Sequence, residues 1–174
     1  MRVQICAVGR LRKRPERDLY EDYLTRFDRT GRALALGPAQ LIEVEDKKGG
    51  GMPAEAALLE RAIPDGALIC SMDERGKMMS SPDFAELLGN WRDQGRQDVS
   101  FVIGCADGID PTLRDSAESS LSFGKKGWPH MWVRVMLAEQ LYRAASILSG
   151  GPYHRVSMPP SGVFQGKMIS GRFY

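Results

Sequence analysis

Apolar residues along this chain gather in five short runs, which are separated by longer stretches where apolar positions recur every three or four residues. The short runs are typical of β-strands and the periodic stretches of amphipathic helices. Their alternation predicts α/β layers around a mostly parallel sheet. The expected strands cover residues 3–8, 40–45, 67–72, 99–103 and 120–123, and the expected helices cover residues 15–29, 53–63, 81–94, 111–119 and 130–149.

Two of the expected strands are apolar along most of their length, ALICSM at 67–72 and VSFVI at 99–103. Such strands are typical of sheets that are covered on both faces. Two helices are expected to begin where a capping residue precedes proline, at Ser81-Pro82 and at Asp110-Pro111. Glycines 49–51 indicate a mobile loop. Because no repeat or linker interrupts the chain before residue 155, residues 1–155 are expected to form a single domain.

The helix expected at 130–149 carries apolar or small residues along two stripes. One stripe can pack against the sheet, so the other needs a partner, and a second copy of the same chain is the simplest one. The stripes therefore predict a homodimer. Glu139 and Arg143 lie one turn apart and are expected to pair on the helix surface. The stripes consist of residues 131, 135, 138, 142 and 145, and of residues 133, 137, 141, 144 and 148.

The composition is that of a soluble globular protein, because 43% of the 174 residues are hydrophobic and 26% are charged. No apolar run is long enough to cross a membrane or to act as a secretory signal, so a cytoplasmic protein is expected. Cys6, Cys70 and Cys105 are interpreted as buried reduced thiols. The chain has two histidines, so no metal site is expected. His130, at a helix start, is interpreted as a capping or packing residue.

Positive charge gathers at the two ends of the chain. Residues 1–34 carry nine Lys and Arg against five Asp and Glu, residues 35–122 carry eight against sixteen, and residues 123–174 carry seven against one. Basic ends suit a polyanion, because neutralisation of phosphates by Lys and Arg provides most of the sequence-independent affinity for nucleic acids. Solvated surface charge explains any single cluster equally well.

The sequence lacks the motifs of several common chemistries, among them GxGxxG after the first strand, a Walker phosphate loop and HExxH. Three loops with glycines, at 72–77, 104–109 and 123–129, instead follow strands and should meet at the carboxyl edge of a parallel sheet, where ligands bind. Gly104, Gly108, Gly124 and Gly127 would let the backbone approach a small ligand. Each glycine taken singly is explained as well by a tight turn.

Tyr153-His154-Arg155 follow the helix-breaking run Gly150-Gly151-Pro152. They offer an aromatic face, a group that titrates near neutral pH and a bidentate cation. Stacking on a base with the arginine on a phosphate suits RNA recognition, and a frayed surface turn is the alternative. Residues 156–174 have no acidic residue and no clear period. They are expected to form a flexible or loosely docked tail, or to be an artificial or read-through addition.

Two segments resemble a known family. FVIGCADGID at 101–110 and SSLSFGKKGWPHMWVRVMLAEQLYRAASILSGGPYHR at 119–155 are closely similar to the C-terminal half of the RlmH family, SPOUT-class methyltransferases of bacterial ribosomal RNA. The resemblance implies an α/β-knot fold in three layers, with a parallel sheet whose chain forms a trefoil knot. It also implies that S-adenosyl-L-methionine binds bent in that knot and that the protein is a homodimer.

The resemblance also assigns site residues. The cofactor positions of the family correspond to Met72, Gly104 and the run Phe123-Gly124-Lys125-Lys126-Gly127-Trp128. Arg143, Tyr153, His154 and Arg155 are expected to place the RNA, with His154 as the proton acceptor. The cofactor loops of one subunit should face the arginine or tail residues of the other. No metal is implied.

The reaction implied by the resemblance is transfer of a methyl group from S-adenosylmethionine to N3 of a pseudouridine in 23S ribosomal RNA, at position 1915 in helix 69. The partner would be this RNA within the large subunit or the assembled ribosome. A second hypothesis is a non-catalytic, dimeric RNA- or ribosome-binding module on the same fold. Intact glycine loops favour the enzyme, because a binding module has no need to keep a cofactor site open.

Overall fold

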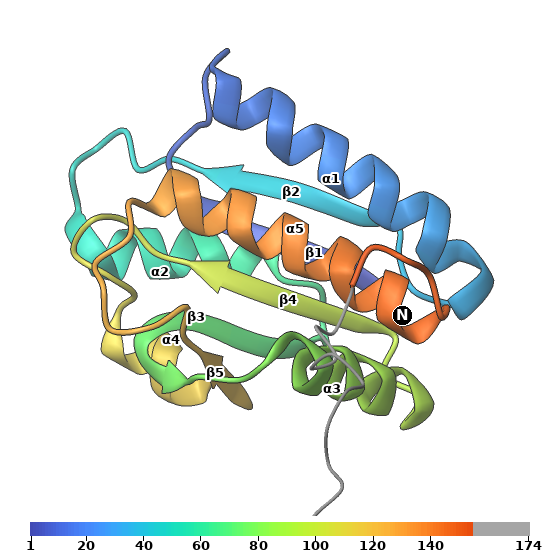
Figure 1. The fold of residues 1–174 in the computed structure, drawn as a ribbon. Helices are drawn as coiled ribbons and strands as arrows, with labels where there is room; N and C mark the ends of the chain where they lie inside the picture. Colours follow the sequence, from blue (N-terminus) through green and yellow to red (C-terminus); the bar gives the residue numbers. More distant parts are fainter. Residues whose placement is uncertain (155–174) are drawn as a thin grey trace, which may run out of the picture.

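Five parallel strands form the centre of the protein and pair in the order β2-β1-β4-β3-β5. The structure is a computed structural model that describes residues 1–154. All strands end at the same edge of the sheet (Figure 1), and the parallel α/β sheet expected from the apolar pattern is thereby confirmed. The strands are β1 (Arg2–Val8), β2 (Ala39–Val44), β3 (Leu68–Lys77), β4 (Asp98–Ile103) and β5 (Ser119–Leu121).

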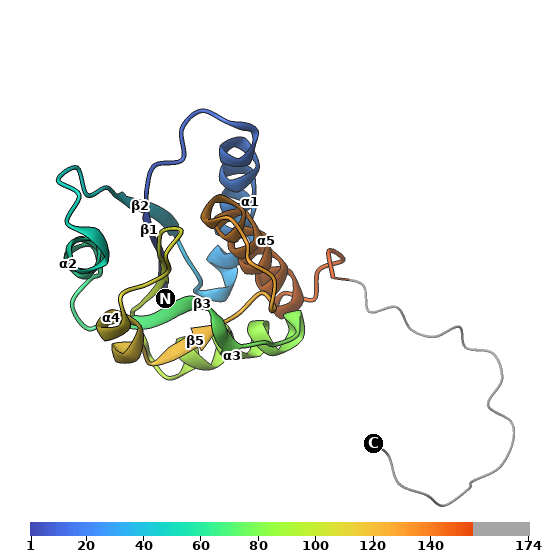
Figure 2. The same ribbon diagram turned by 90° about the vertical axis from the view of Figure 1, so that its left-hand side faces the viewer.

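Helices cover both faces of the sheet and complete the three expected layers (Figure 2). One face carries α1 (Pro15–Gly31), α3 (Ser81–Asp93) and α5 (His130–Leu148), and the other carries α2 (Gly51–Ala62) and α4 (Pro111–Ser116). A single 3-10 turn, η1 (Arg32–Leu34), follows α1. Within residues 1–154 no helix is both long and apolar enough to span a membrane.

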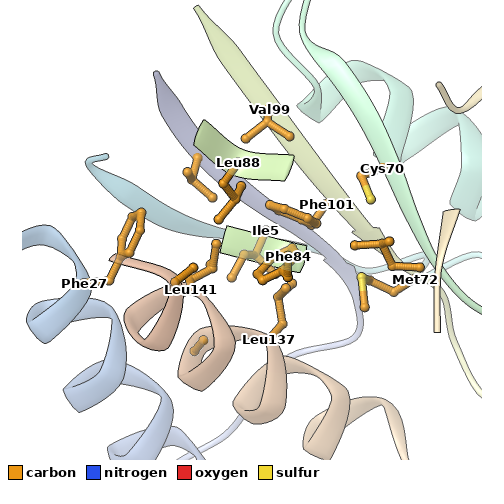
Figure 3. Close-up of a cluster of buried hydrophobic side chains, with 14 of the residues drawn as sticks. Ile5, Phe27, Cys70, Met72, Phe84, Leu88, Val99, Phe101, Leu137 and Leu141 are labelled. Carbon is orange, nitrogen blue, oxygen red and sulfur yellow. The ribbon is translucent and has the colours of Figure 1, made fainter. Parts of the chain in front are cut away.

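The central strands β1 and β4 bury side chains on both faces, which explains why their sequences are mostly apolar. The buried polar exceptions, Gln4, Asp98 and Ser100, are hydrogen-bonded to one another. Ile5 and Phe101 point toward α1, α3 and α5, where Phe84 of α3 meets the Phe101 ring edge-on at a centroid distance of 6.1 Å (Figure 3). Cys6 and Val102 point to the opposite face, beneath α2 and α4. Because successive side chains of a strand alternate between faces, each apolar run supplies both clusters.

The cap of α3 lies one residue earlier than expected. Ser80 accepts a hydrogen bond from the backbone N–H of Asp83, whose carboxylate accepts one from the N–H of Ser80, so the two form a capping box. The Ser81 hydroxyl instead donates to Gln140 of α5 at 2.8 Å and ties the two helices together. The other expected cap, Asp110 at the start of α4, is confirmed.

Several element bounds also differ from expectation. α2 begins at Gly51, so the last residue of the glycine run is helical and not part of a loop. α4 ends at Ser116 and not at 119, because Ala117 already has the extended conformation that leads into β5. β5 ends at Leu121 and not at 123.

β3 continues five residues beyond its expected end, so the loop predicted at 72–77 belongs to the strand. It is not regular there, because Met72 and Lys77 both pair with Leu121. The residues between them form an arc around the chain at 121–122. Within this arc, Ser122 donates from its backbone N–H to Lys77 O at 3.1 Å and from its hydroxyl to Glu74 O at 3.1 Å. A Cβ added to Gly76 would lie 2.6 Å from the Leu121 backbone, so only glycine permits this crossing.

Both sides of α5 are covered within the same chain. α1 packs along one side and α3 along the other, and the side chains of Leu137 and Leu141 point into the core between α5 and the sheet (Figure 3). The inference that the second apolar stripe needs another subunit is therefore wrong, because α1 and α3 bury it. The homodimer itself stays a prediction. Trp132, on the first turn of α5, is 44% exposed.

Candidate functional site

A pocket of about 250 Å³ opens at the edge where the strands end. Three segments and one helix end form it: the arc of β3, the loop after β4, the chain after β5 and the first turn of α5. The convergence of three loops predicted from the sequence is thus seen in the structure. A second pocket of about 290 Å³, between β3, α3 and α5, shares Met72 and residues 121–124 with the first.

Seven of the eight residues expected to bind a cofactor line the first pocket. The exception is Lys125, which is exposed and lies outside the pocket lining, whereas its neighbour Lys126 is part of it. Whether these residues bind a cofactor stays a prediction, but the fold brings them together. The seven are Met72, Gly104, Phe123, Gly124, Lys126, Gly127 and Trp128.

The glycines of the pocket serve two different purposes. A Cβ on Gly104 would lie 2.1 Å from the carbonyl oxygen of Gly108, so glycine at 104 is needed to close the loop itself. This differs from the expectation that Gly104 makes room for a ligand. At Gly108, Gly124 and Gly127 a Cβ would meet nothing within 4 Å. These three positions therefore leave open space in the pocket, where a ligand can approach the backbone.

The pocket combines both signs of charge with apolar surface. Asp73, whose side chain is only 5% exposed, is paired with Arg75 at 2.9 Å, and the hydrogen bond from Arg75 lowers the pKa of the carboxyl group. Burial lowers the pKa of His130, and the positive charge of Arg134 lowers it further, so both favour the neutral imidazole. Lys126 contributes a cation at the rim, and Phe123 contributes apolar surface.

A second polar cluster lies at the other end of α5. Arg143 donates to Glu139 at 2.9 Å, which confirms the pair expected from their spacing. The Tyr153 hydroxyl donates to the same carboxylate at 3.1 Å, and the Arg143 guanidinium lies 4.8 Å from the centroid of the Tyr153 ring. Three of the four residues expected to place the RNA, Arg143, Tyr153 and His154, are therefore in one cluster. The fourth, Arg155, lies outside the described residues, as does the expected tail at 156–174.

The protonation of this cluster follows from its hydrogen bonds. Nδ1 of His154 lies 3.3 Å from Nη1 of Arg143. Because a guanidinium can only donate, Nδ1 is the acceptor and the ring proton of neutral His154 is on Nε2. His154 must therefore leave Arg143 before it can accept a proton at Nδ1. Burial and the neighbours Tyr23 and Glu139 raise the pKa of Tyr153, which stays a phenol at neutral pH.

The pocket and the cluster are far apart within one chain. His130 lines the pocket at the first residue of α5, and Arg143 is thirteen residues further along the helix. A helix rises about 1.5 Å per residue, so roughly 20 Å separate the two. A reaction needs its reacting atoms about 3–3.5 Å apart. The two groups of predicted residues cannot meet on one small substrate atom within a single chain.

Sequence reasoning missed several residues around the pocket. Arg134 has a fully buried side chain that is paired with Glu43 of β2 at 2.9 Å. The signal was present, since a cation within the apolar run WVRVML must find a partner if the helix is buried. Asp73 and His130 also line the pocket. Asp73 lies in the segment 72–77 that was expected at this edge but was not named as a site residue, and His130 was interpreted only as a capping or packing residue.

Comparison with known proteins identifies the family. A family model described as "Predicted SPOUT methyltransferase" matches residues 1–154. The chain belongs to the SPOUT methyltransferase family. A SPOUT fold agrees with the parallel sheet, and the passage of Leu121 and Ser122 through the arc of β3 is the kind of crossing that a knotted sheet requires.

Curated relatives narrow this assignment to the RlmH family, which confirms the resemblance. A protein from Ruegeria sp. (strain TM1040) named "Ribosomal RNA large subunit methyltransferase H" is 71% identical over 156 residues, which are 90% of this chain and 100% of the relative. A protein of the same name from Roseobacter denitrificans is 70% identical over 155 residues, or 89% of this chain and 99% of the relative.

One solved structure supports the fold alone. The crystal structure of a probable methyltransferase from Bordetella pertussis Tohama I aligns with a TM-score of 0.51 and 14% sequence identity, covering 83% of this chain and 96% of the other.

In the part of the chain that the structure describes, no group of three or more His, Cys, Asp or Glu side chains is placed to hold a metal ion.

Proposed function

We propose that this SPOUT methyltransferase transfers a methyl group from S-adenosylmethionine to N3 of a pseudouridine in helix 69 of 23S ribosomal RNA, in the cytoplasm where ribosomes are found. The observation that carries the proposal is the glycine-lined pocket beside the chain crossing at 121–122. The large-subunit RNA as substrate is supported by the names of relatives that are 71% and 70% identical.

The residues of the pocket fit S-adenosylmethionine. Open space beside Gly127 gives a ligand access to backbone N–H and C=O groups, which can read an adenine or a ribose. At Gly124 there is also open space, but its N–H and C=O already bond the Ser122 hydroxyl. Asp73 and Lys126 offer opposite charges to a ligand that carries an ammonium, a sulfonium and a carboxylate. Phe123 offers apolar surface to a flat ring. Bound there, the cofactor supplies an electrophilic methyl group.

Positioning is the main contribution that these residues can make. The loops around the pocket hold a ligand between β3, the loop after β4 and the first turn of α5, so its orientation is fixed before a substrate arrives. Holding two reactants in line contributes about 7–11 kcal/mol to the lowering of a barrier in favourable cases. Burial of Asp73 also removes water from its carboxylate, so its charge acts more strongly on a ligand than it would in solution.

The RNA side of the reaction is assigned to the cluster of Arg143, Tyr153 and His154. The distance of roughly 20 Å between this cluster and the pocket of the same chain supports a site built from two copies, with the cluster of one subunit facing the pocket of the other. There, Tyr153 would stack on a base, and Arg143 would contact a phosphate. Once released from Arg143, His154 would accept the N3 proton. Arg155 is proposed to join this set.

Two measurements test the proposed function. Calorimetric titration with S-adenosylmethionine should show one site per chain. Incubation with ribosomes that lack the modification should transfer a labelled methyl group, which mass spectrometry should locate on a pseudouridine of helix 69. Methylation of another nucleotide would correct the target. A protein that binds ribosomes but not S-adenosylmethionine would instead be the non-catalytic binding module.

A further inference from the structure

We propose that the loop between β1 and α1, residues 9–14, is a docking surface for the phosphate backbone of the substrate RNA, and that it acts beside the pocket of its own subunit. We name it the basic loop. The inference rests on the proposed function, to which it adds a second RNA contact. This contact is separate from the cluster at the far end of α5.

The basic loop carries four exposed cations and no acid. Arg10, Arg12, Lys13 and Arg14 are exposed, and no Asp or Glu occurs from residue 9 to residue 15. Arg10 lies 3.7 Å from Glu45 in an exposed pair, which contributes little. Among residues 1–154, the other three cations have no carboxylate within 4.0 Å. Such unpaired cations favour a polyanion that releases counterions on binding.

The backbone of the basic loop is held by a buried anchor. The fully buried Arg134 of α5 donates to the carbonyl oxygens of Val8 at 2.6 Å and Gly9 at 2.9 Å, and it pairs with Glu43 at 2.9 Å. The same Glu43 oxygen accepts the backbone N–H of Leu11 at 2.5 Å. Both sides of Arg10 are thus fixed, while the cations beyond it point outward. A loop held in place loses less conformational entropy when RNA binds.

The basic loop borders the pocket. Nη1 of Arg14 contacts Sδ of Met131, on the first turn of α5, at 3.7 Å. A Cβ added to Gly9 would lie 3.8 Å from Nε2 of His130, which lines the pocket. In Figure 1 the chain between β1 and α1 lies at the same end of the molecule as the start of α5. A phosphate backbone on this loop therefore runs past the pocket mouth.

The opposite side of the pocket repels phosphate. Asp73, Glu74 and Asp107 line it on the side of β3 and of the loop after β4. Arg75 neutralises Asp73 only, at 2.9 Å. The rim is thus acidic toward α4 and basic toward α1, and this asymmetry gives the RNA one direction of approach. Lys125 and Lys126 lie in the loop that leads into α5 and extend the positive charge at the mouth.

The test compares a double variant with a matched control. Arg12→Ala/Lys13→Ala removes two cations of the basic loop, while Arg61→Ala removes an exposed cation at the end of α2, at the opposite edge of the sheet. Binding to isolated large ribosomal subunits is measured by filter retention at several salt concentrations. We expect the double variant to bind roughly tenfold or more weakly and to lower the slope of log affinity against log salt by about two. Arg61→Ala should match the parent.

Two further readouts separate the possible failures. Calorimetric affinity for S-adenosylmethionine should be unchanged in the double variant, because its side chains do not line the pocket. If the double variant binds ribosomal subunits with the affinity and salt slope of the parent, the basic loop is not an RNA-docking surface. The proposal is also wrong if the parent binds no ribosomal subunits. A change of oligomeric state by light scattering would show that the loop contacts a second copy instead of RNA. If the parent transfers no methyl group, the proposed function fails. The comparison of ribosome binding between the parent and the double variant still tests whether the basic loop docks RNA.

Discussion

At the scale of single residues, Arg134 joins the fold to the site. It places a positive charge in the interior, where burial lowers the pKa of its guanidinium and Glu43 partly restores it. Its donors also satisfy two carbonyl groups at the end of β1. Arg134 is therefore bound to three acceptors, the carboxylate of Glu43 and the carbonyl oxygens of Val8 and Gly9.

Replacing Arg134 by alanine should lower the free energy of unfolding by about 1–3 kcal/mol, because it leaves two carbonyl groups and the partly buried Glu43 carboxylate, which is 18% exposed, without their donor. Urea denaturation followed by circular dichroism measures the change. Arg61→Ala, an exposed control, should stay within about 0.5 kcal/mol of the parent. A loss as small as that of the control would mean that water or a shifted loop replaces the guanidinium.

Asp98 gives a pH dependence with a defined sign. Hydrogen bonds from Arg2, at 2.8 and 2.7 Å, and then from Gln4 lower the pKa of its carboxyl group. A lowered pKa in the folded state stabilises the protein above the unfolded value of about 3.9, and this stabilisation is lost as the pH falls through the folded value. Asp98→Asn should therefore be less stable than the parent at pH 7, and the difference should shrink below about pH 4. Urea denaturation midpoints of the parent and the variant, measured between about pH 3 and pH 7, give this difference in stability. A difference that does not change with pH would contradict a lowered pKa of Asp98 as its cause.

At the scale of elements, the loops after β4 and β5 use glycine for different reasons, and substitution can separate them. Gly127→Val should strongly weaken binding of S-adenosylmethionine without changing the melting temperature, because its Cβ projects into open space. Gly104→Val should lower the melting temperature, because its Cβ would lie 2.1 Å from Gly108 O. Calorimetric titration measures the affinity of both variants for S-adenosylmethionine, and thermal melting measures their stability. Parent-like binding by Gly127→Val would place the cofactor elsewhere.

At the scale of the whole molecule, the distance between pocket and cluster predicts that activity needs two chains. Gly127→Val damages the pocket and His154→Ala damages the cluster, so each variant alone should be inactive. After unfolding and refolding an equal mixture, half of the dimers are mixed, and each mixed dimer has one intact pair of pocket and cluster. Methyl transfer to ribosomes should return to about a quarter of the parent level. No recovery, or a parent that light scattering reports as a 19.3 kDa monomer, would contradict the composite site.

The sequence by itself determined the layers and the place of the pocket. Apolar runs such as those of β1 and β4 fill both faces of a sheet, so their continuity predicts a parallel sheet that is covered by helices. Because parallel strands end at one edge, the glycine-bearing loops had to meet there. The pairing of Glu139 with Arg143 followed from helix geometry alone.

Only the tertiary structure decided which surfaces are covered and which groups meet. Nothing in the periodicity of α5 shows that α1 and α3 flank it, so the second stripe was wrongly assigned to another subunit. Several contacts join residues far apart in sequence, among them those between Ser122 and the arc of β3 and those between Arg134 and the basic loop. The position of Asp73 in the pocket also depends on the path of β3. Such contacts depend on the order of the strands and on the path between them. A local pattern contains neither, because helix and strand periods record only which side of an element is buried.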